Sequence, residues 1–302
     1  MMPGMTGVDP FGTSRERYLG PLGGDGVFCV GNADECDHYT EDGAVRIPWR
    51  GRPQPEDVPR VHSLALCPTE AQLRKAVLPA YLPDLVNLES LTLPAPLVAH
   101  LTSPSLTSLV ISNADGQAPP VPLAADTALP ALRALMWVSS CTTPRLPGVV
   151  DPLPPLEFLR TNVSGDGAVL RQLAALPSLR HLELVHLKNV DVVDHLVAPL
   201  RVLEISGTGR DFPVARLAEI VTLEALRLNG VRAEIDCAVF QALPNLVQLT
   251  VLNSKRVVNV EALLDCPELA SVTFIDCGNP FGRDGKALFR SKGFAELDID
   301  YS

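Results

Sequence analysis

The sequence predicts an α/β solenoid, in which short parallel strands stack into a sheet and short return segments carry the chain to the next strand. Two observations predict it. A leucine pattern of the form L-x-x-L-x-L returns about every 23 residues over most of the chain. Between its copies, apolar residues follow the i, i+3, i+4 spacing of helices. Hydrophobic residues make up 46% of the 302 residues and charged residues 20%, so the chain can form a packed core.

The central residue of each copy marks one strand. Clear copies are Leu179-x-x-Leu182-x-Leu184 and Leu223-x-x-Leu226-x-Leu228. Because side chains alternate faces along a strand, the central residue and the one two places later point inward. The spacing is regular from Leu135 onward and irregular before it. The markers, which predict about 11 repeats in one elongated domain, are Leu64, Leu91, Leu109, Leu135, Leu159, Leu182, Leu203, Leu226, Leu249, Val272 and Leu297.

The return segments are expected to contain short helices. Helical spacing is found in residues 167–175, 190–197, 213–220, 237–243 and 260–264. Each segment has only two or three turns, so it needs packing against the sheet to be stable. Prolines just before the repeat strands, as in Leu176-Pro177 and Leu243-Pro244, end the preceding segment because proline cannot continue a helix.

These motifs resemble leucine-rich-repeat proteins of the intracellular α/β horseshoe kind, over about residues 58–302. The resemblance implies a curved parallel sheet on the concave face, with short helices or irregular returns on the convex face. The family pattern places Asn or Cys at the ninth motif position, where it satisfies backbone groups of the turn. Only Cys277 fits that pattern, so the turns must satisfy their backbone groups in another way. The other ninth positions hold Ser140, Leu187, Thr208, Val231 and Ser254. The Ala-, Pro-, Val- and Arg-biased composition resembles that of bacterial proteins.

Two segments precede the repeats. Residues 1–20 show little periodicity and are predicted to be a flexible tail. Residues 21–57 hold two strand-like stretches, 26–30 and 44–49, on either side of a polar loop. Because a solenoid needs covered ends, this segment is predicted to be an N-terminal cap, as a β-hairpin. Residues 58–302 then form the leucine-rich-repeat domain.

Composition and charge exclude some classes of partner. The net charge is −10, which disfavours binding to nucleic acid and to anionic membrane surfaces. No apolar run is long enough for a transmembrane helix, and the N-terminus lacks the features of a signal peptide. The seven cysteines are scattered and are predicted to be reduced thiols. We therefore expect a cytoplasmic, monomeric protein.

The concave face of the sheet is the commonest binding surface in leucine-rich-repeat proteins. The motif positions that point to this face carry mixed charge and one aromatic side chain in the middle of the chain, which suits recognition of a protein. The alternative is that Arg160 lies beside Glu183, and Glu204 beside Arg227, as ordinary cross-strand pairs. The candidate partner-binding residues are Met136, Phe158, Arg160, His181, Glu183, Glu204 and Arg227.

Candidate metal ligands are few. Residues 34–38, Asp-Glu-Cys-Asp-His, are the densest cluster, but no second pair of ligands completes a zinc site. Glu296, Asp298 and Asp300 are expected to protect the edge of the last strand rather than to bind a metal. We therefore predict no metal site and no cofactor.

Signals of catalysis are also weak. The glycine-rich residues 20–26 lack the lysine of a phosphate-binding loop. No nucleophile motif surrounds Ser139, Ser140 or Cys141, although His181 or His186 could supply a base. The sequence thus favours a non-enzymatic protein-binding module that acts as an inhibitor, immunity or regulatory partner. The alternatives are a structural or scaffold component of an assembly and, third, an enzyme or metal site within residues 21–57.

Overall fold

The computed structural model describes residues 10–20, 27–31, 45–112, 129–137, 156–162, 176–187, 191–282 and 284–300. The chain forms two compact units: a C-terminal unit of residues 1–14 and 162–302, and an N-terminal unit of residues 15–161. The fold is a leucine-rich-repeat solenoid, as the sequence predicts. The division falls inside the predicted repeat domain, which is natural in a solenoid because each repeat contacts only its neighbours.

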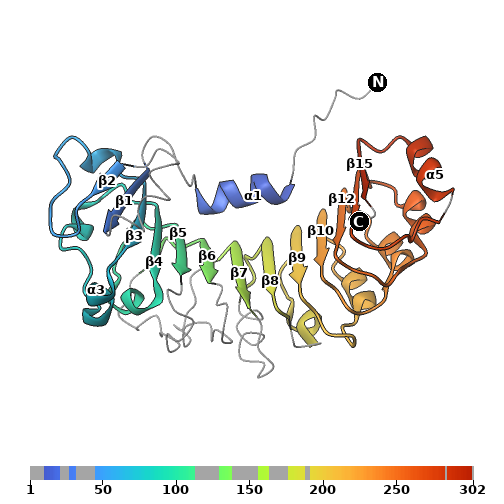
Figure 1. Cartoon of the computed structure of the whole chain (residues 1–302), viewed down its shortest axis with the longest axis horizontal. Coiled ribbons are helices and arrows are strands. Elements are labelled where there is room, and N and C mark those ends of the chain that lie inside the picture. Colours follow the sequence, from blue (N-terminus) through green and yellow to red (C-terminus); the bar gives the residue numbers. More distant parts are fainter. Residues whose placement is uncertain are drawn as a thin grey trace. The chain divides into compact units, whose positions relative to one another are not determined.

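In the C-terminal unit, every predicted marker lies in a strand, and the strands pair in parallel in chain order (Figure 1). The register places Leu182, Leu203, Leu226, Leu249 and Val272 side by side, with Leu297 at the edge. The strands are β8 (His181–Val185), β9 (Val202–Ser206), β10 (Ala225–Asn229), β12 (Gln248–Leu252), β14 (Ser271–Ile275) and β15 (Glu296–Asp300). A small parallel pair, β11 (Ile235–Asp236) and β13 (Val257–Val258), lies in the returns.

The N-terminal unit continues the same pattern. Its strand order is β2-β1-β3-β4-β5-β6-β7, and Leu64, Leu91, Leu109, Leu135 and Leu159 are aligned across it. The irregularly spaced early repeats therefore share one register. The strands are β1 (Val27–Gly31), β2 (Val45–Ile47), β3 (Ser63–Cys67), β4 (Ser90–Pro94), β5 (Ser108–Ser112), β6 (Ala134–Trp137) and β7 (Phe158–Asn162).

The two strands expected in the N-terminal cap are present, but they pair in parallel and do not form a hairpin. Strand β1 joins the repeat register, with Phe28 opposite Leu64 and Val30 opposite Leu66. Phe28 and Val30 are buried, so β1 extends the inward column of the repeats. A parallel pair needs a connection of about a dozen residues. Residues 32–44 supply that length, whereas a hairpin would need only a tight turn.

The helical returns lie where the spacing places them, but they are 3₁₀ helices. In the C-terminal unit they are η4 (Asp191–His195), η5 (Val214–Glu219), η6 (Cys237–Ala242) and η7 (Val260–Asp265). The expected return at 167–175 lies outside the described residues. A 3₁₀ helix rises about 2.0 Å per residue against about 1.5 Å for an α-helix, so a short segment can cross the back of a repeat. Leu217, Phe240 and Leu263 anchor η5, η6 and η7 in the core with no exposed surface.

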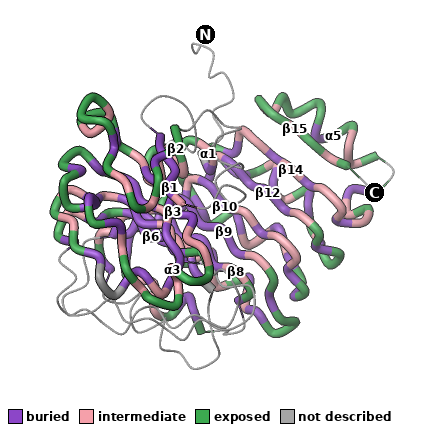
Figure 2. Tube along the Cα trace, turned by 60° about the vertical axis from the view of Figure 1, so that its left-hand side comes forward, coloured by how far each residue is buried: buried purple, intermediate pink, exposed green. Residues whose placement is uncertain are grey.

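The remaining described helices are α1 (Pro10–Leu19), η1 (Val58–Arg60), α3 (Glu70–Lys75), η2 (Leu82–Asp84), η3 (Ala95–His100) and α5 (Gly285–Lys292). Figure 2 shows that most of the central strands are buried, whereas the edge strand β15 and many loops are exposed. Near the end of the C-terminal unit, Phe281 packs edge-on against Phe274 and Phe289, with ring centroids 5.1 and 4.8 Å away. This cluster covers the last repeat with apolar surface.

The eighth motif position adopts the left-handed backbone conformation. It is occupied in the C-terminal unit by His186, Gly207, Gly230, Asn253 and Asp276, with φ between 51° and 70°. The N–H groups of Gly207, Gly230 and Asn253 donate to the last carbonyl of the next strand at 2.8 to 2.9 Å. The turns are thus joined by a ladder of backbone hydrogen bonds.

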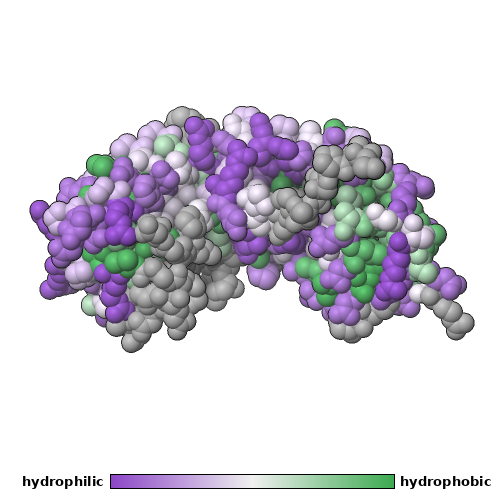
Figure 3. All heavy atoms as spheres, turned by 90° about the horizontal axis from the view of Figure 1, so that it is seen from above, coloured by the Kyte–Doolittle hydropathy of each residue, from purple (hydrophilic) through white to green (hydrophobic). Residues whose placement is uncertain are grey.

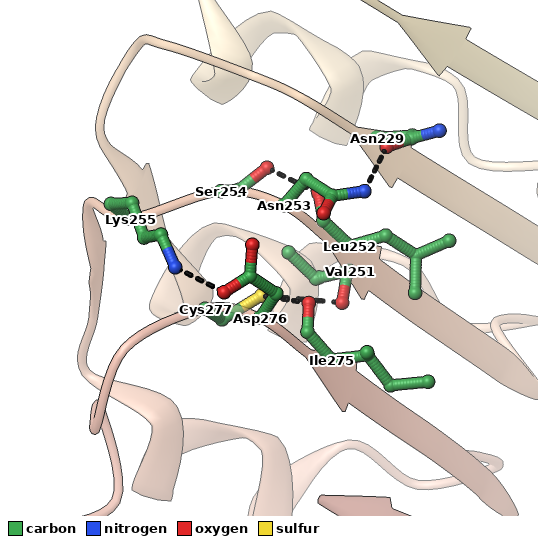
Figure 4. Close-up of polar contacts among 9 residues, drawn as sticks. All are labelled: Asn229, Val251, Leu252, Asn253, Ser254, Lys255, Ile275, Asp276 and Cys277. Atoms are coloured by element: carbon green, nitrogen blue, oxygen red, sulfur yellow. Dashed lines mark hydrogen bonds and ion pairs between the residues drawn. The ribbon is translucent and has the colours of Figure 1, made fainter. Parts of the chain in front are cut away.

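Ninth-position side chains add a second set of hydrogen bonds (Figure 4). Ser254 Oγ accepts from the backbone N–H of Val231 at 3.0 Å and donates to the carbonyl of Leu252 at 2.9 Å. Cys277 Sγ lies 3.3 Å from the carbonyl oxygens of Val251 and Ile275. The missing asparagine ladder is therefore replaced by left-handed residues together with a serine and a cysteine.

Candidate partner-binding surface

One face of the sheet in the C-terminal unit carries the candidate residues. The third motif positions of β8, β9 and β10 hold His181, Val202 and Ala225, and the fifth positions hold Glu183, Glu204 and Arg227. The register places each set in a row across the strands. We call the surface made by these six residues the recognition face.

The first part of the chain's own helix α1, residues 10–14, lies on this face. Within the C-terminal unit, the ring of Phe11 is fully buried and packs with Val202 and Ala225. The guanidinium carbon of Arg227 lies 4.0 Å from the centre of that ring, within the range of a cation–π interaction. Small third-position side chains leave room for the ring, and Arg227 covers one side of it.

Arg227 is also paired with Glu204, as the cross-strand alternative predicts. Its Nη1 donates to Oε2 of Glu204 at 3.1 Å, and the two side chains are 20% and 11% exposed. The two residues face each other across β10 and β9. The ion pair with Glu204 therefore helps to hold the guanidinium group of Arg227 over the Phe11 ring. Arg160 lies in the N-terminal unit and Glu183 in the C-terminal unit.

A chain of polar contacts, which we call the polar relay, runs from Ser14 of α1 through His181 to Glu183 of the sheet. His181 Nδ1 lies 2.6 Å from Oγ of Ser14, and His181 Nε2 lies 3.0 Å from Oε1 of Glu183. Both side chains of the His181–Glu183 pair are 1% exposed. Nδ1 of His181 either accepts from or donates to the Ser14 hydroxyl, depending on the tautomer of the ring. Glu183 stands opposite Glu204, so each of these two carboxylates needs its own partner.

Ser14, His181 and Glu183 are also the residue types of a nucleophile, a base and an orienting acid. A hydrolytic serine must be open to substrate. Here the histidine and the carboxylate are buried at the base of α1, and Ser14 belongs to that helix. We therefore assign the relay to holding the helix on the sheet.

In the N-terminal unit, the second half of α1 packs against β4 and the start of β7. The ring centroids of Tyr18 and Phe158 are 5.9 Å apart, and the Tyr18 hydroxyl donates to Oε2 of Glu157 at 3.3 Å. Ser90 Oγ donates to the carbonyl of Leu19 at 2.9 Å. Phe158 is buried, whereas Met136 and Arg160, which face each other across β6 and β7, are half-buried.

The structure thus gathers His181, Glu183, Glu204 and Arg227 on one face and places Met136, Phe158 and Arg160 on β6 and β7. The sequence predicts a flexible tail for residues 1–20, whereas the structure has a helix from Pro10 to Leu19. Phe11, Ser14, Arg15 and Tyr18 lie at helical spacing in the sequence; in the structure they are buried or half-buried, whereas Thr13, Glu16 and Arg17 are exposed.

The candidate metal ligands at residues 34–38, which the sequence does not predict to form a metal site, lie outside the described residues. Within the ranges that the structure describes, no three His, Cys, Asp or Glu side chains come together as metal ligands would. Glu296, Asp298 and Asp300 lie on the exposed edge strand β15, where Glu296 accepts a hydrogen bond from the hydroxyl of Ser271 at 3.0 Å.

A hollow of about 350 Å³ lies in the N-terminal unit between residues 49–51 and the end of α3. Its lining includes Trp49, Arg50 and Lys75 and contains no His, Cys, Ser, Asp or Glu. The hollow therefore lacks a serine or cysteine nucleophile and a carboxylate base. Hydrophilic residues predominate on the molecular face drawn in Figure 3.

No described helix is long and apolar enough to pass through a membrane.

No protein-family model and no curated protein matches the sequence. Among solved structures, the chain is similar to an internalin (inlF) from Listeria monocytogenes str. 4b F2365. The TM-score is 0.50 and the identity 14%, over 85% of this chain and 80% of that one. An internalin C2 (inlC2) from the same strain is 18% identical over 72% of this chain and 83% of that one, with a TM-score of 0.36. The first likeness supports the fold described above.

Proposed function

We propose that this protein is a non-enzymatic binding module that binds another protein through the recognition face and through Met136, Phe158 and Arg160 of the N-terminal unit. The main support for this proposal is the buried position of the Phe11 ring on the recognition face. A face that buries an aromatic ring against Val202, Ala225 and Arg227 has the chemistry of a protein-binding hot spot. Arginine and aromatic side chains are the residues that most often anchor such contacts.

The finer proposal is an inhibitor-type, immunity or regulatory partner, working as a monomer in the cytoplasm. Cys237, Cys266 and Cys277 are buried thiols, which is compatible with a reducing compartment. Mixed charge on the recognition face would set the register of the bound protein, because unmatched charges at an interface are costly.

The test begins with the tagged full-length protein, mild crosslinking and identification of the captured protein. Its affinity is then measured for Arg160→Glu and Arg227→Glu, with Arg216→Glu as the matched charge reversal. Arg216 lies on η5, away from the sheet strands, and its side chain is 41% exposed. We expect the first two changes to weaken binding at least tenfold and the third to leave it unchanged. Arg227→Lys, which keeps the charge and the pair with Glu204, controls for damage to the fold.

The scaffold alternative predicts the opposite ranking, because the returns would then make the contact and Arg216→Glu would weaken binding most. The enzymatic alternative depends on Cys36 and His38, which lie outside the described residues. Substituting both without any change in activity or metal content would remove it.

A further inference from the structure

We propose that α1 is a displaceable internal ligand, and that the partner replaces it with a helical segment carrying an aromatic side chain and, three residues later, a hydroxyl group. The inference rests on the proposed function, since it names the chemistry of the partner that the recognition face would take. This pattern is taken from α1 itself, in which the Phe11 ring contacts the guanidinium group of Arg227 and the Ser14 hydroxyl contacts Nδ1 of His181.

The residues that contact Phe11 form a binding site suited to an aromatic ring. Phe11 is completely buried although it lies on a ten-residue helix near the chain terminus. Its contacts come from two strands and combine an apolar floor with a cation above one ring face. His181 offers Nδ1 beside it, at 2.6 Å from the hydroxyl oxygen of Ser14. These groups recognise a ring and a hydroxyl one helical turn apart.

The helix α1 depends on docking for its own stability. Isolated helices shorter than about 12–15 residues are marginal in water, and Gly12 lowers the helix propensity further. At its C-terminal end, Gly20 has φ +76° and donates its N–H to the carbonyl of Glu16 at 3.1 Å, so the helix stops there. Undocking therefore unfolds only this segment, and such local openings lie at the low end of a protein's stability range.

If α1 leaves the recognition face, the charged and polar side chains of the strands still contact one another. Arg227 keeps its hydrogen bond to Glu204, and His181 keeps its contact with Glu183. The site of the Phe11 ring and Nδ1 of His181 become open to water. A partner that fills both positions restores the lost contacts, whereas a partner with an aliphatic residue would leave Arg227 without its ring.

An internal occupant lowers the apparent affinity for any external one by the fraction of molecules in the open state. Phe11→Ala removes the ring and should shift the segment towards the open state. The probe is a fluorescent peptide with the sequence of residues 10–20, titrated into the full-length wild type, Phe11→Ala and Thr13→Ala. Thr13 is exposed on the same helix and serves as the matched control. A second peptide carries alanine at the phenylalanine position.

We expect the peptide to bind Phe11→Ala about tenfold more tightly than it binds the wild type or Thr13→Ala, by the same population argument. The alanine peptide should bind none of them. Equal binding of the peptide to all three proteins, or no binding to Phe11→Ala, overturns the proposal.

Trypsin gives an independent readout, because Arg15 and Arg17 lie within α1. Cleavage at these sites should be at least about tenfold faster in Phe11→Ala and faster in Ser14→Ala, with Thr13→Ala cut at the wild-type rate. An unchanged rate in Phe11→Ala overturns the proposal, because the segment would then be held without its ring. Thermal unfolding of each variant shows whether the rest of the protein stays folded.

The two proposals can fail separately. If the peptide follows the expected pattern but the captured partner ignores Arg160→Glu and Arg227→Glu, the proposed function is wrong and the internal ligand stands. If the partner requires Arg227 but binds the wild type and Phe11→Ala equally well, the recognition face stands and the displacement is wrong.

Discussion

At the residue scale, the turns depend on backbone conformations that few residues adopt. Gly207 and Gly230 have φ of +70° and +62°, and their N–H groups tie one turn to the next strand. Asn253 and Asp276 take the same conformation, which Asn and Asp tolerate better than other residues. The sequence holds this signal at the eighth motif position, one residue before the position at which the family pattern places asparagine.

Two glycine substitutions test this role. Gly230→Ala places a Cβ at φ +62° and should lower the free energy of unfolding by about 1 kcal/mol. Gly209→Ala is the control, since Gly209 has an ordinary φ and a Cβ there would meet nothing within 4 Å. It should be neutral or slightly stabilising because it restricts the unfolded chain. Urea denaturation of both variants measures the difference, and equal stabilities would contradict the role of the left-handed turn.

The buried cysteines should be unreactive. Burial raises the pKa of the Cys237, Cys266 and Cys277 thiols, so little reactive thiolate is present near neutral pH. We expect these three residues to react with a maleimide at pH 7.5 far more slowly in the native protein than after denaturation in urea. Peptide mapping by mass spectrometry assigns each label to its residue. Rapid native labelling of Cys237 would show that η6 opens readily.

At the element scale, the strands could be predicted and the helix type could not. Inward residues such as Leu203 and Leu226 recur in a period-two pattern that only a strand satisfies. The returns have apolar residues at i, i+3 and i+4, a spacing that suits both an α-helix and a 3₁₀ helix in six residues. The length available at the back of each repeat decides between them, and that length is a property of the stacked sheet.

A surface ion-pair group on η5 gives a pH-dependent prediction. The Arg216 side chain donates to Glu219 at 2.5 Å and also contacts Asp194, and its hydrogen bond lowers the pKa of Glu219. A carboxyl pKa that is lower in the folded state favours folding above its unfolded value, and that contribution is lost as pH falls through the folded value. Arg216→Ala should raise the pKa of Glu219 in an NMR titration. Glu261, an exposed carboxylate on η7, is the control and should not shift.

Helix α1 was the element hardest to predict. Its ten residues include Gly12 and only three large apolar side chains, Phe11, Tyr18 and Leu19, so it looks like a polar tail. Its order comes from contacts with residues more than 100 positions away, such as Tyr18 with Glu157 and Ser14 with His181. Those contacts also explain why His181 and Glu183, predicted as part of an open binding surface, are buried.

At the scale of the whole molecule, the repeat pattern predicts the architecture and leaves the partner open. The net charge of −10 and the many hydrophilic residues on the face drawn in Figure 3 favour contacts with defined charge complementarity. Among the described residues, the exposed large hydrophobic side chains are spread over separate segments; they are Val45, Val77, Val86, Val197, Val221 and Leu288.

The most direct test is hydrogen–deuterium exchange of the full-length protein with and without its captured partner. The account predicts slower exchange in β8, β9 and β10 together with faster exchange in residues 11–19, because the partner takes the place of α1. Protection confined to the returns η4 to η7, with exchange in α1 unchanged, would contradict it and favour a scaffold that binds through its returns.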